Sequence, residues 1–338
     1  MAIKFGTNGN DQINDLDYST GVPIDLGTND TVYGLGGHDI ITLNNGNDTA
    51  FGGDGNDGFY DFGTGNDRMY GEAGNDTFFA GSGNDLYDGG AGVDWVSYIF
   101  SAQVALVDLQ AGFALSDGID TLVSIENVTG TWWNDTILGS DVSNQLHGNG
   151  GEDRLDGRGG DDYITAGTGN DTVFGGAGHD TMLGEMGEDW MDGGSGNDVI
   201  WAGIGDDIMT GGTGADVFYY SYRNETNEFD TIKDFQHGID KIDLSAIDAR
   251  PDIAGNQAFV FDSTQDGSLE EFFDGLSDDW SGLLSGEPGP WINGDTGEIE
   301  IRHSGDYTYV YIAYGDGLID SSIRLDGRIN LTASDFIL

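Results

Sequence analysis

The sequence predicts an all-β protein: a parallel β-roll solenoid in two blocks joined by a β spacer, with a β-rich C-terminal capping domain that carries one short helix. Three observations predict the roll. From Gly130 to Tyr219 the chain repeats every nine residues without a slip, as Gly-Gly-x-Gly-x-Asp-x-U-x, where U is apolar. Glycine recurs where a tight turn needs positive φ. The last three places put one apolar side chain between two outward ones, which is the alternation of a strand.

The sixth place of the repeat holds aspartate throughout, except at Asn144. Carboxylate oxygens are ligands that calcium prefers. One carboxylate cannot hold the ion, so a second must come from the turn stacked above, two nonads along the chain. We therefore expect several calcium ions shared between neighbouring coils, with a weak or empty site at Asn144. The predicted sixth-place ligands are Asp11, Asp30, Asp39, Asp48, Asp57, Asp67, Asp76, Asp85, Asp94, Asp135, Asp153, Asp162, Asp171, Asp180, Asp189, Asp198, Asp207 and Asp216.

The period divides the chain into four predicted segments. Residues 1–97 form the first block, in which a polar stretch interrupts the repeat and the extra residue Asp61 shifts its frame by one. Residues 98–129 are the spacer, residues 130–219 the second block, and residues 220–338 the C-terminal domain.

The spacer contains alternating apolar runs, VALVDL and TLVSIENV, which are typical of strands. One interpretation is a set of extra coils without calcium that bridges the two blocks. The other is a binding surface, with Trp132 and Trp133 exposed beside it. Adjacent strand residues point to opposite faces, so at least one tryptophan needs a partner or a covering loop.

The nonapeptide resembles the calcium-binding repeat of the RTX (repeats in toxin) proteins. The resemblance implies a ligand set for each ion. Backbone carbonyls come from the first and third places of one turn and from the second and fourth places of the stacked turn. Both sixth-place carboxylates complete the shell.

The segment 220–338 resembles the C-terminal domain of serralysin-type metalloproteases, in FDTIKDFQHGIDKIDLSAIDA, AGNQAFVF and RLDGRINLTASDFIL. The resemblance implies a cap on the roll and an uncleaved signal for an ABC-transporter (type I) secretion machine. The terminal residues Asp335 to Leu338 match its acidic-then-apolar end, although an ordinary edge strand could also end this way. It also implies that Asp234 and Asp240 close the last calcium site.

Two stretches depart from that family. The segment SLEEFFDGLSDDWSGLL looks helical, with a capping box from Ser268 and Glu271. We expect its apolar face to pack on the domain's own sheet, the alternative being self-association or partner docking. The stretch YGDGLIDSS is shortened, which argues against an extra calcium site there.

The composition of the chain limits the classes of function and partner that it can have. The chain has 61 acidic and 11 basic residues, a net charge of −50 and no cysteine. Nucleic acid is excluded as a partner because phosphate binding needs clustered Lys and Arg. No disulfide framework is available, and no apolar run reaches the roughly 18 residues of a transmembrane helix. The N-terminal residues lack the apolar core of a secretory signal peptide, so export would need a different signal.

Catalysis is not expected from the residues present. None of the five histidines belongs to an HExxH zinc motif, no Gly-x-Ser-x-Gly elbow occurs, and no cysteine nucleophile exists. The histidines are His38, His147, His179, His237 and His303.

We therefore expect a secreted protein, extracellular or at the cell surface, that folds on binding calcium after export. Its expected role is structural, in a surface or matrix, with self-association or a surface partner. The alternative is the export and folding module of a larger secreted enzyme, such as a metalloprotease or a polysaccharide-modifying enzyme. The repeat that follows Met1 almost at once favours the first. A third hypothesis is that the chain is an enzyme of an unrecognised kind.

Overall fold

The computed structural model describes residues 3–14, 29–221, 228–246, 260–262, 298–313 and 321–338. The chain divides into two compact units, Met1–Thr168 and Gly169–Leu338. Within the described residues nearly every element is a short β-strand, and the one helical turn is a 3-10 turn, η3 (Ala333–Asp335). The predicted all-β, parallel β-roll is confirmed. The helix predicted from Ser268 onward lies outside the described residues.

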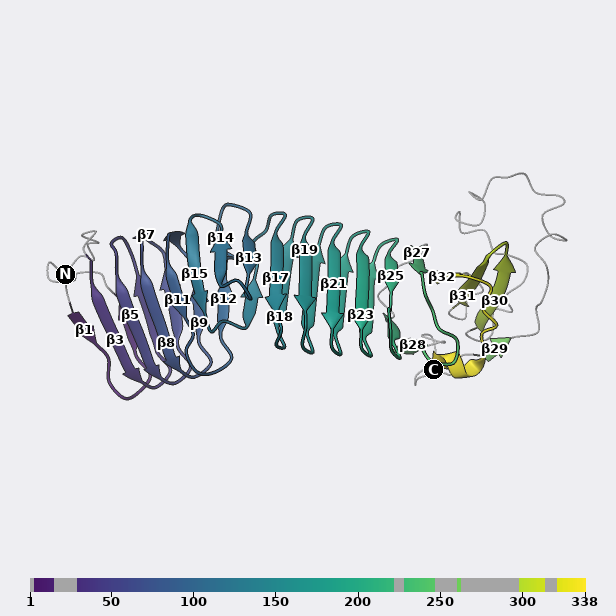
Figure 1. The fold of residues 1–338 in the computed structure, drawn as a ribbon, viewed down its shortest axis with the longest axis horizontal. Helices are drawn as coiled ribbons and strands as arrows, with labels where there is room; N and C mark the ends of the chain where they lie inside the picture. Colours follow the sequence, from purple (N-terminus) through teal and green to yellow (C-terminus); the bar gives the residue numbers. More distant parts are fainter. Residues whose placement is uncertain (1–2, 15–28, 222–227, 247–259, 263–297, 314–320) are drawn as a thin grey trace. The chain divides into compact units, whose positions relative to one another are not determined.

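In the first unit, successive nonads place their strands alternately in two parallel sheets (Figure 1). Strands of neighbouring coils pair in parallel, and in a regular coil the paired residues are 18 apart in the chain; Val32 lies opposite Ala50, for example. One sheet contains, in pairing order, β1 (Ile3–Phe5), β3 (Thr31–Gly36), β5 (Thr49–Asp54), β8 (Arg68–Ala73), β11 (Leu86–Asp88), β15 (Ile119–Val123), β14 (Phe113–Leu115), β13 (Leu106–Asp108), β17 (Thr136–Ser140) and β19 (Arg154–Arg158). The other contains β2 (Gln12–Asn14), β4 (Ile40–Leu43), β6 (Gly58–Asp61), β9 (Thr77–Phe79), β12 (Trp95–Ser97), β16 (Asn127–Thr129), β18 (Gln145–Gly150) and β20 (Tyr163–Thr168). A small pair, β7 (Thr64–Gly65) and β10 (Ser82–Gly83), joins two neighbouring turns.

The spacer strands belong to the roll of the first unit. Strand β15 pairs in parallel with β11, and β13 pairs in parallel with β17. Strand β14 runs antiparallel between them. The opposite sheet gains only β16 between β12 and β18. The spacer therefore adds three strands to one sheet and one to the other, and the hydrogen-bonded ladders continue through it.

An arginine ties the spacer to the coil that follows. Both guanidinium nitrogens of Arg158 donate to the Asp108 carboxylate, at 2.8 and 2.9 Å, and one also donates to the Gly139 carbonyl at 2.9 Å. This bidentate contact holds the pKa of Asp108 below its usual value. It links β13 to the second-block coils through a fork geometry that lysine cannot reproduce.

In the second unit the same alternation continues as far as residue 221. One sheet contains β21 (Thr172–Ala177), β23 (Trp190–Ser195), β25 (Ile208–Thr210), β27 (Glu228–Ile232), β32 (Ser321–Asp326), β31 (Tyr307–Ala313), β30 (Glu298–Ser304) and β29 (Val260–Asp262). The other contains β22 (Thr181–Met186), β24 (Val199–Ile204), β26 (Val217–Ser221), β28 (Lys241–Ala246) and β33 (Phe336–Ile337). Strand β31 runs antiparallel to both β30 and β32, whereas β33 pairs in parallel with β28.

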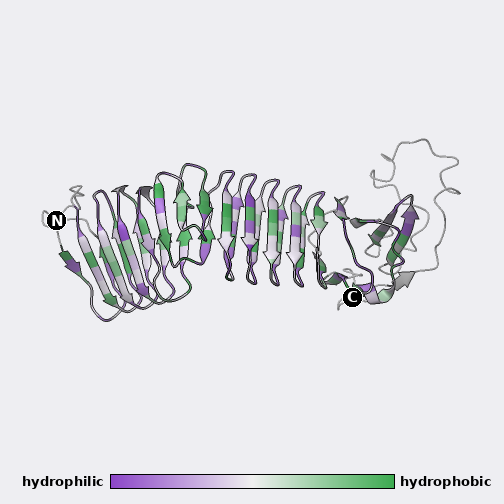
Figure 2. Cartoon of the chain, viewed as in Figure 1, coloured by the Kyte–Doolittle hydropathy of each residue, from purple (hydrophilic) through white to green (hydrophobic). Residues whose placement is uncertain are grey.

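The core of each roll is thin. Most of its strands bury a central apolar residue, as Val173, Met182 and Ile200 do, while the residues on either side of it stay half exposed or exposed. Figure 2 shows the corresponding hydrophobic segments within the strands. One buried side chain of this kind contributes roughly 1.5–3 kcal/mol.

Candidate metal sites in the stacked turns

The sixth-place aspartates form columns along each roll, one residue above the next. The backbone N–H of one aspartate donates to Oδ1 of the aspartate in the neighbouring coil; Asp39 donates to Asp57 at 2.7 Å, and Asp189 donates to Asp207 at 2.8 Å. Each such bond spans 18 residues in a regular coil. The same bond joins Asp11 to Asp39, Asp30 to Asp48, Asp48 to Asp67, Asp57 to Asp76, Asp67 to Asp85, Asp76 to Asp94, Asp135 to Asp153, Asp171 to Asp189, Asp180 to Asp198, and Asp198 to Asp216.

The second carboxylate oxygen faces a different surrounding. Oδ2 of Asp198 is buried and has no hydrogen-bond partner among the described residues. A Cβ added to Gly193, the first residue of that turn, would lie 2.6 Å from this oxygen and 2.7 Å from the Gly211 carbonyl oxygen. We call this space between a carboxylate oxygen and a first-place carbonyl the oxygen cradle. Further Oδ2 atoms with the same lack of a partner belong to Asp39, Asp57, Asp76, Asp94, Asp189, Asp207 and Asp216.

Burial makes these carboxylates hard to ionise in the absence of a cation. It raises the pKa of Asp189 to about 8, with the charges of Asp207 and Asp171 adding to the effect. It raises the pKa of Asp76 to about 7, and that of Asp94, Asp198, Asp207 and Asp216 to about 6. Two unit charges about 5 Å apart repel by roughly 3 kcal/mol at an effective dielectric constant of about 20.

The donor set fits calcium. Buried carboxylate oxygens without partners and backbone carbonyls line the cradle, and calcium takes oxygen ligands alone. The sixth-place carboxylates and the first-place carbonyls are the groups that would hold the ion. A bound dication would cancel the repulsion along the column.

Some predicted ligands sit in other surroundings. Oδ2 of Asp135 accepts the Thr131 N–H at 2.5 Å, and Oδ1 accepts the Thr131 hydroxyl at 2.9 Å as well as the Ala105 N–H at 2.7 Å. Asp11 similarly accepts both the N–H and the hydroxyl of Thr7. At these two turns a threonine therefore donates to the sixth-place carboxylate through both its N–H and its hydroxyl.

Asn144 keeps its place in the column, but its amide is satisfied within the protein. Its Oδ1 accepts the N–H of Ser140 at 2.7 Å and the Ser140 hydroxyl at 3.1 Å. Its Nδ2 donates to the Glu126 carbonyl at 2.6 Å. An NH₂ group directed at a carbonyl takes up an acceptor that a cation would otherwise use, and the weak or empty site stays our prediction.

The two aspartates predicted to close the last site differ from each other. Asp240 continues a column, because its Oδ1 accepts the Asp216 N–H at 3.1 Å across 24 residues. Asp234 lies outside the column, and its two oxygens accept the N–H groups of Gly211 and Gly212 at 2.9 and 2.7 Å.

Three acidic residues that sequence reasoning missed also continue the columns. Asp120 accepts the Asp85 N–H at 3.0 Å, Glu126 accepts the Asp94 N–H at 2.8 Å, and Asp230 accepts the Asp207 N–H at 3.1 Å. Asp120 and Asp230 each precede a polar-then-apolar pair, Thr121-Leu122 and Thr231-Ile232. An aspartate followed by such a pair is the end of the nonad. This pattern could have identified Asp120 and Asp230 from the sequence, although the glycines of the repeat are missing before them.

Trp132 and Trp133 lie in a turn before β17, and not on a strand. Their exposed fractions are 61% and 53%. The strand argument, in which one of the two must be covered, was wrong because a turn does not alternate its side chains between two faces.

The terminal residues form an edge of the second unit. The Asp335 carboxylate is fully buried and accepts the Gly238 N–H at 2.9 Å and the Thr332 N–H at 2.7 Å. His237 Nδ1 lies 3.0 Å from it. Phe336 and Ile337 then pair with β28. The edge strand considered in the sequence analysis is thus present, and export through this terminus stays a prediction.

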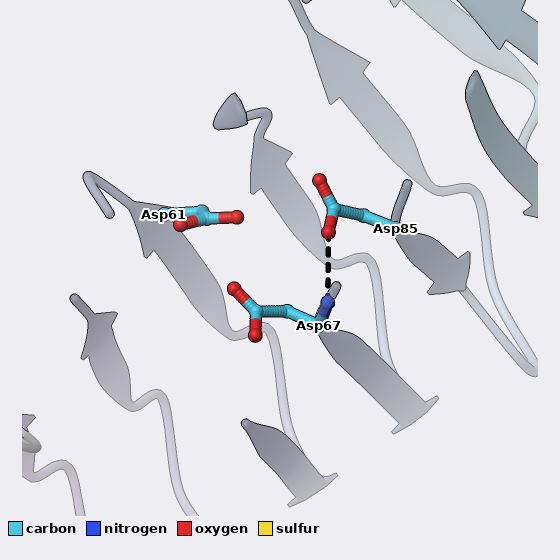
Figure 3. Close-up of side chains that lie close together, drawn as sticks. All are labelled: Asp61, Asp67 and Asp85. Carbon is cyan, nitrogen blue, oxygen red and sulfur yellow. Dashed lines mark hydrogen bonds between the residues drawn. The ribbon is translucent and has the colours of Figure 1, made fainter. Parts of the chain in front are cut away.

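One pair of turns contains a third buried carboxylate. Asp61, Asp67 and Asp85 come from the end of β6 and from the turns before β8 and β11, and Figure 3 shows their carboxylates directed toward a common space. Burial raises the pKa of Asp61 to about 9, with the charges of Asp67 and Asp85 adding to the effect.

Two family models match parts of this chain. Residues 26–59 and 63–96 match the family described as RTX calcium-binding nonapeptide repeat (4 copies), and residues 112–278 match the family described as Peptidase M10 serralysin C terminal. Among solved structures, the solution structure of the AlgE6R3 subunit from the Azotobacter vinelandii mannuronan C5-epimerase is similar at 23% identity and a TM-score of 0.23, over 55% of this chain and 80% of that chain. A comparison with curated proteins gave no match.

The two sheets and the acidic columns define a β-roll repeat fold. More particularly, the chain contains stretches that match RTX calcium-binding nonapeptide repeats and a region that matches the serralysin C-terminal family. The serralysin-type match begins within the spacer, and so includes the second block of repeats. No helix in the described part of the chain is long and apolar enough to span a membrane.

Proposed function

We propose that this chain is a secreted calcium-binding protein whose roll folds when calcium outside the cell enters the acidic turns, after type I export. The observation that carries the proposal is the column of buried carboxylates, such as Asp189, Asp198 and Asp207, each with one oxygen that lacks a hydrogen-bond partner among the described residues. Such columns are unfavourable without a cation and favourable with one.

The magnitude is sufficient for a folding switch. Extracellular modules bind calcium with Kd values of roughly 10⁻⁴ to 10⁻³ M. At about 2 mM calcium, one such site contributes roughly 0.6 to 1.8 kcal/mol. Several sites together reach the roughly 5–15 kcal/mol that is the whole stability of a domain. At calcium concentrations far below these constants the contribution is near zero, so the chain stays unfolded and can pass through a narrow secretion channel.

The serralysin-type match supports export through an ABC-type machine. In this proposal the protein has a structural role at the cell surface or in an extracellular matrix, and the edge strands at the roll ends allow self-association. Analytical ultracentrifugation in millimolar calcium tests the last point: a monomer at all concentrations would contradict self-association.

The same match favours a second candidate function, the export and folding module of a larger secreted enzyme. The two candidates differ in the size of the secreted product. Intact-mass spectrometry of the protein recovered outside the producing cell separates them: the mass of this chain alone supports the first, and a larger product that contains this chain supports the second.

Circular dichroism tests the folding proposal directly. We expect the full chain to lose its β spectrum in excess chelator and to regain it in millimolar calcium, but not in equimolar magnesium, which dehydrates reluctantly and demands a near-ideal octahedron. A chelated protein that is as folded as the calcium form would refute the proposal.

A further inference from the structure

The three-carboxylate cluster of Asp61, Asp67 and Asp85 arises from the one frame shift in the first block. The column bonds from Asp48 to Asp67 and from Asp57 to Asp76 span 19 residues, whereas the bond from Asp67 to Asp85 spans 18. The extra residue in the longer coils is Asp61, which ends β6. The cluster is therefore specific to this place in the chain and does not follow from the repeat itself.

Asp61 occupies an inward-facing strand position, where the neighbouring coil has an apolar residue. It pairs in register with Leu43 on β4, which is fully buried. Asp61 itself is only 3% exposed, and Asp67 and Asp85 are 1% and 2% exposed. Burying an isolated carboxylate in such a row is costly unless the charge is paired or coordinates a metal.

The Asp61 carboxylate is directed into the cluster with one oxygen unsatisfied. Oδ1 accepts the Gly63 N–H at 3.1 Å, while Oδ2 is buried and has no hydrogen-bond partner among the described residues. None of the ion pairs found in the described part of the chain involves Asp61. One ligand atom from each of the three aspartates lies within 4.8 Å of the others, close enough for one ion to touch all three.

The surrounding backbone leaves room for that arrangement. A Cβ added to Gly81 would lie 2.6 Å from both oxygens of Asp61, so only glycine at this position admits the third carboxylate. On the other side, the buried Tyr87 hydroxyl donates to Asp85 Oδ2 at 3.3 Å, which orients that carboxylate. Figure 3 shows Asp61 facing Asp67 and Asp85, which are themselves joined by the column hydrogen bond.

We propose that Asp61, Asp67 and Asp85 bind one calcium ion together, more tightly than the two-carboxylate turns of the first unit, and that this site is the first of them to fill. Affinity of oxygen sites for calcium rises with the number of charged ligands and with rigidity, and this site has both. The inference rests on the proposed function, since it assigns an order to the calcium sites of the roll.

Calcium titration of the full chain, starting from chelated protein and read by isothermal titration calorimetry, tests the proposal. For Asp61→Asn we expect the tightest binding step to weaken at least tenfold while the later steps stay. Asp161→Asn is the matched control, because it makes the same substitution at an exposed fifth-place residue of the first unit, outside the set of groups that would hold the ions. It should leave every step unchanged.

A second variant guards against a defect specific to asparagine. Asp61→Ala gives this position the same residue type as the buried Ala80, which directly follows the neighbouring strand β9, and it should show the same tenfold loss. If both Asp61 variants titrate as the wild type does, the third carboxylate is no ligand and the inference is overturned. If the wild type binds no calcium, the proposed function fails instead, so the two failures are distinguishable.

A thermal scan separates a metal role from a purely structural one. A ligand role predicts that the loss of melting temperature caused by Asp61→Asn is larger in saturating calcium than at the lowest calcium concentration that folds the protein. Equal shifts of the melting temperature in the two conditions would show that Asp61 acts only through packing, and would also overturn the inference.

Discussion

The backbone N–H of Asp189 donates to Oδ1 of Asp207 at 2.8 Å, while Oδ2 of each residue is buried without a hydrogen-bond partner among the described residues. One oxygen of each carboxylate thus fixes the stacking of two coils, and the other remains available to a cation. The same side chain is a structural connection and a ligand, which couples metal binding to the pairing of coils.

Removing one column carboxylate should destabilise the protein only as far as calcium fills that site. For Asp189→Asn we expect a loss of about 0.6–1.8 kcal/mol in about 2 mM calcium, the contribution of one extracellular-type site. At the lowest calcium concentration that folds the wild type the loss should be smaller, because the site is less occupied. Urea titrations at the two calcium concentrations measure this. Glu188→Gln, an exposed change of the same charge one residue earlier, is the control.

The chelated protein should respond to pH in a defined direction. Burial raises the pKa of Asp76 to about 7 and that of Asp189 to about 8, from an unfolded value of 3.8. A raised folded-state pKa gives stability that is complete below about pH 4 and is lost as pH rises through about 6 to 8. Ellipticity at fixed chelator should therefore show more β structure at pH 5 than at pH 8. A chelated protein that loses structure on acidification over this range would contradict the prediction.

With calcium in excess the pH dependence should reverse. Protons compete with the ion for the same carboxylates, so acidification should lower calcium affinity. Titrations at pH 5 and pH 8 check this, and affinity that does not change with pH would argue that the buried carboxylates are not the ligands.

Filling one oxygen cradle should abolish one site. The φ of Gly193 lies outside the left-handed region, but the new Cβ would lie 2.6 Å from Asp198 Oδ2 and 2.7 Å from the Gly211 carbonyl oxygen, so these groups must move apart. We expect Gly193→Ala to reduce bound calcium, counted by equilibrium dialysis, and to lower the melting temperature in calcium. Gly58→Ala is the control, since its nearest neighbour is the Tyr60 ring at 3.6 Å. Equal effects of the two variants would contradict a site at Gly193.

Restoring the missing carboxylate should create a site. In Asn144→Asp, the amide nitrogen that donates to the Glu126 carbonyl becomes an oxygen, which repels that carbonyl unless a cation lies between them. We expect the variant to lose about 1–3 kcal/mol at the lowest calcium concentration that folds the protein and to recover part of it in saturating calcium. Asn134→Asp, an exposed change in the preceding turn, is the control. A variant that loses the same stability in both conditions would show that no site forms.

Much of the fold follows from the period alone. A nine-residue repeat with glycine in the turn and a lone apolar residue in the strand brings equivalent residues together every 18 positions, as the bonds from Asp39 to Asp57 and from Asp180 to Asp198 show. Contacts between residues at this constant separation can be predicted from the repeat alone, without the rest of the chain.

The exceptions are the residues whose neighbours lie at other separations. Asp85 meets Asp120 across 35 residues, Asp94 meets Glu126 across 32, and Asp207 meets Asp230 across 23. At these three places the segment between successive column residues is longer than the regular 18 residues. Nothing in a local pattern states how far a loop will travel before it returns, because the cost of closing a loop rises only slowly with its length.

The sequence by itself determined the roll, its two inward apolar rows and the acidic columns, because each is a consequence of spacing. Only the tertiary structure decided what Asp61 does: as an extra residue it has no place in the repeat, and its surroundings depend on which coils stack beside it. Asp61 lies opposite the buried Leu43 and beside Gly81, and this position brings its carboxylate close to those of Asp67 and Asp85.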